Sequence, residues 1–347
     1  MKTLIEKVPR AMEYCKQVVE NIEKYKMFPG EEFEQIISGV LSTTEEDTQG
    51  DKMAKEALYS MVKSIKENIV WQRVEHNPLI QPIGRTIAAE VFPIPKSNEY
   101  FLAGILGIYS MANIPRFCDF GVDLKKDFQE ENIDFKIDFS KPQAKLSINP
   151  INFDKKTIDE MLSTKPNLVE NEIILEVRKA AEPIEIVKIF VAIYLLMQNP
   201  FSKKFLEAFG NEAAKSVISF LGWVKEKVVK KVHEVRKKKK ILFEFQSKYK
   251  NCNVEFVIDE TEDIIKYIKA IDSISFAARS AIYLIDQLEK YEPQLLIYEF
   301  DMKNEDWIPI HAATKKRGII SDKPKLIALE KYKGLSTGGI VKVRDYE

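Results

Sequence analysis

The tripeptide Asp301-Met302-Lys303 places an acid and a lysine two residues apart, directly after the apolar stretch QLLIYEF (294–300). Metal-dependent nucleases use this arrangement at the end of a strand, where the acid binds Mg²⁺ and the lysine stabilises negative charge. The same residues open DMKNED (301–306), a polar segment that must turn the chain between two predicted strands. Because 31% of the residues are charged, such triplets arise by chance. We therefore interpret Asp301 and Lys303 as a turn.

The other chemistry-bearing residues show no spacing that predicts a metal centre, a catalytic residue or a cofactor. Histidines and cysteines occur singly, as His76, His233, His311, Cys15, Cys118 and Cys252. No pair has zinc-ligand spacing, and no P-loop, dinucleotide fingerprint, zincin or hydrolase motif occurs. The segment GLSTGG (334–339) could form a phosphate-binding nest, but no helix with a lysine follows it, so we interpret it as a connector. Gly104 and Gly107 fit either close packing or close approach to a ligand.

A basic run, VVKKVHEVRKKKK (228–240), ends a long predicted helix. The expected binding residues are its cations and two earlier aromatic residues: Phe205, Phe209, Lys230, Lys231, Arg236, Lys237, Lys238, Lys239 and Lys240. Cations at a helix C-terminus complement the helix dipole, so a solvated helix end explains them first. A basic face beside an apolar stripe is also typical of helices on anionic membrane surfaces. Nucleic acid is disfavoured, because the net charge is zero and no aromatic residues alternate with the lysines.

The predicted helix covers about residues 201–239. Its apolar stripe has helical spacing: Phe205, Phe209, Ala213, Val217, Leu221, Val224, Val228, Val232 and Val235. A helix of this length extends roughly 55 Å, which exceeds the width of a small sheet. Part of the stripe therefore needs another partner: the N-terminal domain, a second copy or a lipid surface.

A ββαββ unit follows the long helix. Its predicted elements are strands at 241–246 and 253–259, a helix at 262–291, and strands at 294–300 and 307–313. Asp259 and Glu262 are positioned as the N-cap of the helix and its capping-box partner. We expect the long helix to cover one face of this sheet and to form a helical hairpin with the apolar segment 183–197.

The N-terminal half shows a different sequence pattern, with helices followed by proline-interrupted strands. It contains predicted helices at 3–26, 31–41 and 52–71, followed by predicted strands at 86–94, 132–140, 144–150 and 171–179. Prolines interrupt the chain from Pro78 to Pro115, and a short turn joins the strands at 132–140 and 144–150 as a hairpin. The fold class is therefore α+β, with an N-terminal domain at 1–180 and a C-terminal domain at 181–347.

Composition limits the classes of function. The chain has 347 residues, of which 45% are hydrophobic, with 53 basic and 53 acidic side chains. Scattered cysteines suit a reducing cytoplasm, and the N-terminus lacks the apolar core of a signal peptide. The longest uncharged runs, 100–115 and 189–202, are shorter than a membrane-spanning helix requires. We expect a cytoplasmic protein, with peripheral contact to a membrane as an option.

Residues 183–315 resemble modules appended to uncharacterised bacterial proteins of anti-phage conflict systems. The resemblance rests on the order of elements around FLEAFGNEAAKSVISFLGWVKEKVVKKV and LLIYEFDMKNEDWIPIHAA. It implies a regulatory or effector-associated role and transfers no catalytic residue. We expect a non-enzymatic component of a bacterial antiviral defence system that binds a protein partner or itself. The alternative is a metal-dependent nuclease or phosphodiesterase with its site in the N-terminal domain.

Overall fold

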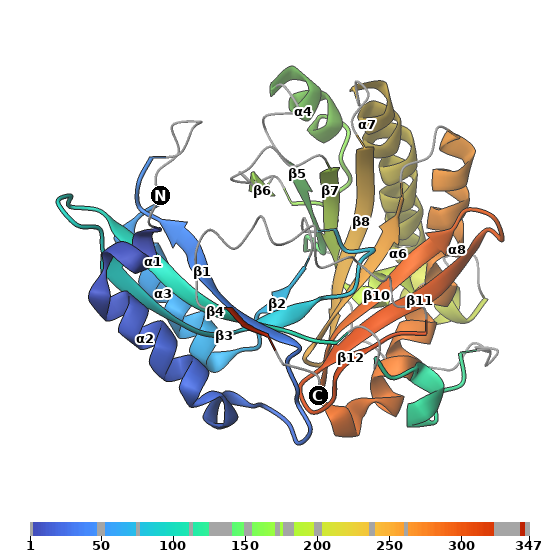
Figure 1. The fold of residues 1–347 in the computed structure, drawn as a ribbon. Helices are drawn as coiled ribbons and strands as arrows, with labels where there is room; N and C mark the ends of the chain where they lie inside the picture. The colour runs from blue at the N-terminus through green and yellow to red at the C-terminus, as the bar shows by residue number, and fades with distance from the viewer. Residues whose placement is uncertain are drawn as a thin grey trace. The chain divides into compact units, whose positions relative to one another are not determined.

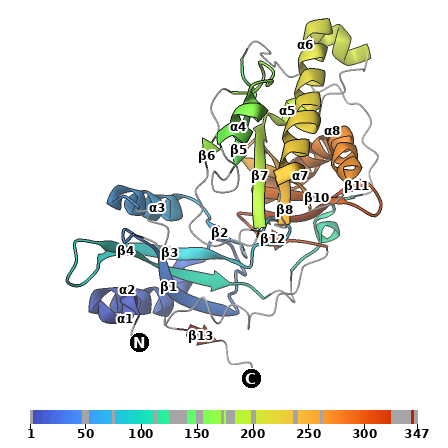
Figure 2. The ribbon, with the colours of Figure 1, turned by 90° about the horizontal axis from the view of Figure 1, so that it is seen from above.

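The computed structural model describes residues 3–46, 53–73, 77–110, 114–124, 141–148, 155–170, 174–175, 184–197, 203–235, 240–259, 263–322 and 341–343. The chain forms two compact units (Figures 1 and 2). Unit 1 consists of Met1–Pro115 and Lys315–Glu347, and unit 2 of Arg116–Thr314. Both units contain helices and a sheet, as the α+β assignment predicted.

Unit 1 is built on an antiparallel sheet with the order β13-β1-β4-β3-β2. Its strands are β1 (Gln35–Thr43), β2 (Trp71–Gln72), β3 (Gly84–Pro93), β4 (Tyr100–Ile108) and β13 (Val341–Val343). The predicted strand at 86–94 is confirmed as β3, and β13 from the C-terminal tail pairs with β1. The sheet therefore joins the two ends of the sequence in one unit.

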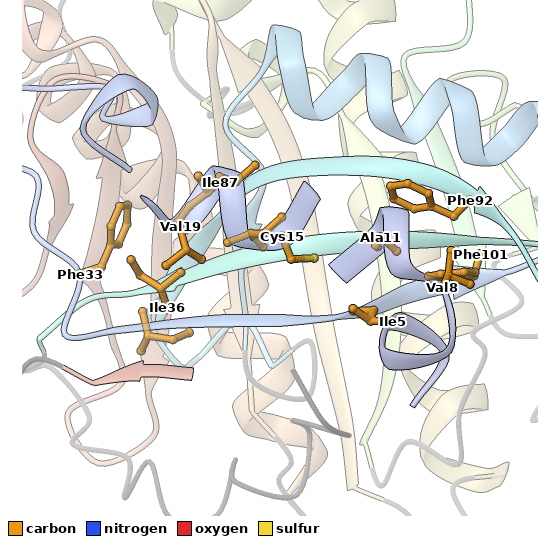
Figure 3. Close-up of a cluster of buried hydrophobic side chains, with 14 of the residues drawn as sticks. Ile5, Val8, Ala11, Cys15, Val19, Phe33, Ile36, Ile87, Phe92 and Phe101 are labelled. Atoms are coloured by element: carbon orange, nitrogen blue, oxygen red, sulfur yellow. The ribbon is translucent and has the colours of Figure 1, made fainter. Parts of the chain in front are cut away.

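Helices cover both faces of this sheet, because alternate strand residues point to opposite sides. The helices are α1 (Leu4–Lys7), α2 (Pro9–Glu20) and α3 (Lys55–Glu67), with a 3₁₀ turn at Ile22–Tyr25. On one face, Ala11 and Cys15 of α2 belong to a core cluster with Phe101 and Ile105 of β4 (Figure 3). On the other face, Leu58 of α3 packs with Ala89 and Leu102.

A buried ion pair fixes the segment between α2 and β1. The Arg85 side chain donates from Nε and Nη2 to Glu31, at 2.7 and 2.9 Å, and from Nη2 to the Tyr25 carbonyl. Glu31 also accepts from the Tyr109 hydroxyl at 2.6 Å and from the Met27 N–H at 2.7 Å. Burial, followed by the adjacent Glu31 carboxylate, raises the pKa of Tyr109, which keeps the phenol protonated as a donor. All four hydrogen bonds that the Glu31 carboxylate accepts come from donors in unit 1.

Residues 31–41 were predicted as a helix, and this prediction was wrong. Residues from Gln35 onward form strand β1, which pairs with β4 from Gln35↔Ile108 to Thr43↔Phe101. The spacing of Ile36, Ile37 and Val40 fits one face of a short helix, but all three are β-branched and also suit a strand. The pairing with β4 is what makes this segment a strand. Glycines in β4 make this pairing possible: a Cβ at Gly104 would lie 2.3 Å from Leu41, and one at Gly107 would lie 2.3 Å from Phe33. Side-chain packing thus explains both glycines.

Unit 2 contains a mixed sheet with the strand order β11-β10-β9-β8-β7-β5-β6. Its strands are β5 (Ala144–Ile148), β6 (Ile174–Leu175), β7 (Ile184–Val191), β8 (Lys240–Tyr249), β9 (Cys252–Ile258), β10 (Pro293–Asp301) and β11 (Asp306–Thr314). The ββαββ prediction is confirmed: β8 and β9 are antiparallel, β9 and β10 are parallel, and β10 and β11 are antiparallel. The short strand β12 (Gly318–Ile320) follows β11 in the sequence and contributes Ile319 to the core of unit 1.

The helix between β9 and β10, α8 (Ile264–Gln287), packs against an aromatic face of the sheet. This face carries Phe243, Phe245, Phe256, Tyr298, Phe300 and Trp307. Ser280 shares a hydrogen bond of 2.7 Å with Tyr298, and the Trp307 Nε1–H donates to the Ala270 carbonyl at 3.0 Å. The N-cap of α8 is Asp263, which accepts from the Ile265 N–H at 2.9 Å, and not Asp259 as predicted.

The remaining helices of unit 2 precede β8. They are α4 (Lys155–Leu162), α5 (Ile193–Leu196), α6 (Lys203–Trp223), a π-helical segment (Val224–Val229) and α7 (Lys230–Val235), with a 3₁₀ turn at Phe117–Phe120. The predicted long helix is therefore confirmed from Lys203 to Val235, interrupted by non-helical backbone at Gly210 (φ 80°) and by the π-helical segment. Lys225 of that segment forms an ion pair with Asp272 of α8 at 2.8 Å.

The predicted helical hairpin was wrong, because its first arm is mainly strand β7 and only its last residues form α5. The run IEIVKIFV is rich in β-branched residues, which suits a strand paired between β5 and β8. The same pairing explains why the compact units differ from the predicted domains 1–180 and 181–347. A boundary at 180 would separate β5 from its neighbour β7. The predicted strand at 132–140 lies outside the described residues.

The Glu31–Arg85 pair generates a prediction for stability. Replacing Glu31 with Ala leaves the Arg85 guanidinium buried without its carboxylate, and we expect a loss of about 3–5 kcal/mol in the free energy of unfolding. Glu23→Ala removes an exposed ion pair with Lys26 and serves as the control, with an expected loss below about 1 kcal/mol. Urea unfolding followed by circular dichroism measures both values, and equal small losses would contradict the anchoring role of Glu31.

A second prediction compares two isoleucines of α8. Ile271 is buried against the sheet, whereas Ile265 is exposed. Ile271→Asp buries an unpaired carboxylate, so we expect it to destabilise unit 2 by several kcal/mol. Ile265→Asp on the same helix should leave the unfolding midpoint almost unchanged. If both variants unfold at the same urea concentration, the assigned orientation of α8 is incorrect.

Candidate functional site

Asp301 and Lys303 form the turn that the sequence predicted. The Asp301 carboxylate accepts from the backbone N–H of Lys303 at 2.8 Å, from that of Asn304 at 3.3 Å and from the Asn304 side chain at 2.6 Å. These hydrogen bonds close the connection between β10 and β11 as an Asx-type turn. In the described part of the chain, no three His, Cys, Asp or Glu side chains are grouped closely enough to hold a metal ion.

The two histidines that the structure describes lie on different elements. His311 is buried in β11, and His233 is half-buried on α7. His76 and the segment 334–339 lie outside the described residues. Neither His233 nor His311 is part of the Asp301 turn.

The expected basic site is only partly described. Lys230 forms an ion pair with Glu226 one turn earlier, and Lys231 forms ion pairs with Glu160 at 2.6 Å and Glu234 at 3.5 Å. The hydrogen bond with Glu160 raises the pKa of Lys231 and joins α7 to α4. Both lysines are thus engaged within unit 2.

The other expected binding residues are distributed differently. Lys240 lies just after the predicted helix and begins strand β8, where it pairs with Ile184. Phe205 and Phe209 lie on the first turns of α6, but their side chains are outside the described part, as are residues 236–239. Among the described helices, none combines the length and apolar character that crossing a membrane requires.

A different surface emerges on α8, which runs beside α6 in Figures 1 and 2. We call it the outer face of α8 and define it by four exposed residues at helical spacing: Ile265, Lys269, Asp272 and Phe276. Phe276 is 60% exposed and Ile265 is 56% exposed, which is unusual for large apolar side chains on a helix whose opposite side is buried. Two apolar groups therefore face solvent from one side of the helix.

The charged residues between these apolar groups already have partners. Lys269 contacts both carboxylate oxygens of Glu305, at 2.6 and 2.7 Å, and Asp272 pairs with Lys225. These ion pairs connect α8 to the β10–β11 turn and to the π-helical segment. They neutralise the charge of the outer face, so that the apolar side chains are its distinguishing feature.

Sequence reasoning missed this surface, although a signal was present. The buried apolar stripe of α8 contains Ile271, Ile274 and Ile282. Phe276 and Ile265 are eleven residues apart, or about three turns, and lie off that stripe. Two large apolar residues in register on the polar side of an amphipathic helix indicate a second contact surface.

The turn geometry yields a testable distinction between Asp301 and Lys303. Asp301→Ala removes three hydrogen bonds from the turn, and we expect a loss of about 1–2 kcal/mol in the free energy of unfolding. Lys303→Ala retains the backbone donor and should change this free energy by less than about 0.5 kcal/mol. Urea unfolding of the two variants provides the comparison. A larger effect from Lys303 than from Asp301 would contradict the turn assignment.

Comparisons of the chain with protein-family models, with curated proteins and with solved structures found no match. Its function therefore has to be inferred from the geometry described above.

Proposed function

We propose that the protein is a non-enzymatic interaction component that binds a protein partner through the outer face of α8. The exposure of Phe276 and Ile265 on one side of a well-packed helix is the observation that carries this proposal. Binding sites between proteins concentrate their energy in a few large side chains, and aromatic residues are prominent among them. An exposed phenylalanine that the fold does not need for its core fits that role.

The charge pattern favours a protein over an anionic surface at this site. Lys269 and Asp272 are neutralised by Glu305 and Lys225, so the outer face offers no excess positive charge to a phosphate backbone or an anionic lipid. The partner chemistry that fits is an apolar helix face, whose side chains would pack against Phe276 and Ile265. The rotation of α8 is fixed by Ser280 and Ala270 on its buried side, so the two anchors are presented in a defined geometry.

The process we propose for this interaction is bacterial antiviral defence, in which the chain regulates or assists an effector. The resemblance of residues 183–315 to modules of anti-phage conflict systems supports this part of the proposal. Expression of the chain with its neighbouring genes should reduce phage plaque numbers. Plaque numbers that stay unchanged with the complete gene neighbourhood would remove the defence assignment and leave the binding proposal to its own test.

The binding proposal predicts a position-specific cross-link. A photoreactive phenylalanine analogue at position 276 should give one discrete cross-linked species in the cells that produce the protein. The same analogue at Tyr59, an exposed aromatic residue on α3 of unit 1, is the matched control. Mass spectrometry of the product identifies the partner, and a product of twice the chain's mass would identify a second copy.

The identified partner allows the affinity to be tested. Phe276→Ser removes the larger anchor, and we expect binding to weaken by about 2 kcal/mol, or roughly thirtyfold. Tyr59→Ser should leave the affinity unchanged. Equal affinities of the Phe276→Ser variant and the unchanged chain in calorimetry would overturn the proposal, as would cross-links of equal yield at both positions. Sedimentation with anionic vesicles that survives Phe276→Ser would place membrane contact elsewhere on the chain.

A further inference from the structure

The sheet face opposite α8 carries an open pocket of about 650 Å³ within unit 2. It lies over the ends of four neighbouring strands, β5, β7, β8 and β9. Pockets of 300–1,000 Å³ are typical of small-molecule sites. The size of this pocket therefore suits a ligand as large as a mononucleotide.

Strand register defines which side chains face the pocket. The pairs Lys145↔Phe190, Phe190↔Gln246 and Gln246↔Glu255 place these four residues in one row across the sheet. Directly paired residues point to the same side, and neighbouring strands are about 4.8 Å apart. The ring of Phe190, the amide of Gln246 and the carboxylate of Glu255 are thus consecutive groups on one surface.

The amide and the carboxylate both present hydrogen-bond acceptors. The Gln246 amide N–H donates to Glu244 at 2.5 Å. Because a carboxylate accepts hydrogen bonds, this contact uses an amide N–H and not the amide oxygen, which keeps its acceptor capacity. Glu255 is 6% exposed and lines the pocket, and a carboxylate can accept up to about four hydrogen bonds. The side chains of Gln246 and Glu255 therefore suit a planar ligand with several hydrogen-bond donors along one edge.

A cation lies one row further along the same face. Lys248 is paired with Asn253 across the β8–β9 hairpin, two residues from Gln246 and Glu255 on their own strands. Lys248 is exposed, and the described residues give it no ion-pair partner, whereas Lys145 is paired with Glu170 at 3.1 Å. Two residues of a strand span roughly 6.6 Å, so the Lys248 side chain begins one row beyond the Glu255 carboxylate and extends toward the end of the hairpin.

We propose that this pocket binds a guanine nucleotide. The half-buried Phe190 ring provides a stacking surface for the base, as aromatic side chains on sheets do in nucleotide recognition. The Glu255 carboxylate accepts from the N1–H and the amino group of guanine, and the Gln246 oxygen lies beside it. The Lys248 ammonium pairs with the phosphate. A pyrimidine such as uracil offers one ring N–H and no amino group to the two acceptors.

Isothermal titration calorimetry of the full chain with GMP, IMP, UMP and guanosine tests the site. GMP should bind more tightly than IMP, which lacks the amino group, and than UMP. Guanosine should bind about tenfold more weakly than GMP, because it lacks the phosphate. A short guanine-containing RNA distinguishes the sources of the ligand: tighter binding than GMP assigns the site to a strand, and equal binding assigns it to the free nucleotide.

Variants assign each group its role. Glu255→Gln should weaken GMP binding about tenfold and abolish the preference for GMP over IMP. Lys248→Ala should weaken GMP binding about tenfold and leave guanosine binding unchanged. Lys156→Ala on the exposed surface of α4 is the matched control and should change neither affinity. Gln246→Leu tests the same ligand edge if Glu255→Gln does not fold.

Two results would overturn the proposal. One is the absence of binding heat for GMP at millimolar concentration with a chain that unfolds cooperatively. The other is GMP binding that all pocket variants retain, which would place the nucleotide elsewhere.

Discussion

The strict alternation of side chains in the sheet of unit 2 is the constraint on which its other features depend. Phe245 and Phe256 face α8, while Gln246 and Glu255, their neighbours in sequence, face the opposite side. The opposite face is mixed, because Leu242, Val257 and Ile297 on it are fully buried while Gln246 and Glu255 add polar groups. The aromatic residues supply the burial that holds α8, and the polar residues are left to form a surface with hydrogen-bonding capacity. The two proposed binding surfaces follow from this division.

The buried side of α8 determines what its outer side can be. Ala270, Ala277, Ala278 and Ala281 are buried, and these small residues let the helix backbone lie close to the large rings of the sheet. The core is therefore filled mainly by aromatic residues from the strands. Phe276 is not needed to fill it and remains exposed on the outer face.

Local patterns predicted the elements whose signal is contained in one continuous segment. The ββαββ order was visible because α8 has many turns of consistent periodicity and its flanking strands alternate clearly. The segments 31–41 and 183–197 were misassigned because short apolar runs fit a helix and a strand equally well, and pairing with distant strands decides between them. The need for glycine at positions 104 and 107 becomes clear only from the structure, where Leu41 and Phe33 occupy the space that a Cβ atom would take.

The two candidate sites differ in how far apart in sequence their residues lie. The exposed side of α8 was encoded locally, in the spacing of Ile265 and Phe276, although a polar helix face draws attention to its charges. The pocket was not encoded locally, because Lys145, Phe190, Gln246 and Glu255 come from four strands, of which only β8 and β9 are adjacent in sequence. Only the register of three strand pairs places them in one row.

The same register also protects the pocket. A shift of one residue in β9 would move Phe256 to the opposite face and Glu255 beneath α8, which would place a carboxylate in an aromatic core. The packing of Phe256 against Tyr298 and Trp307 opposes this shift. The energy that stabilises the fold thus also fixes the positions of Gln246 and Glu255, although neither residue belongs to the apolar core. A binding surface on a sheet can in this way be kept rigid by side chains that never contact its ligand.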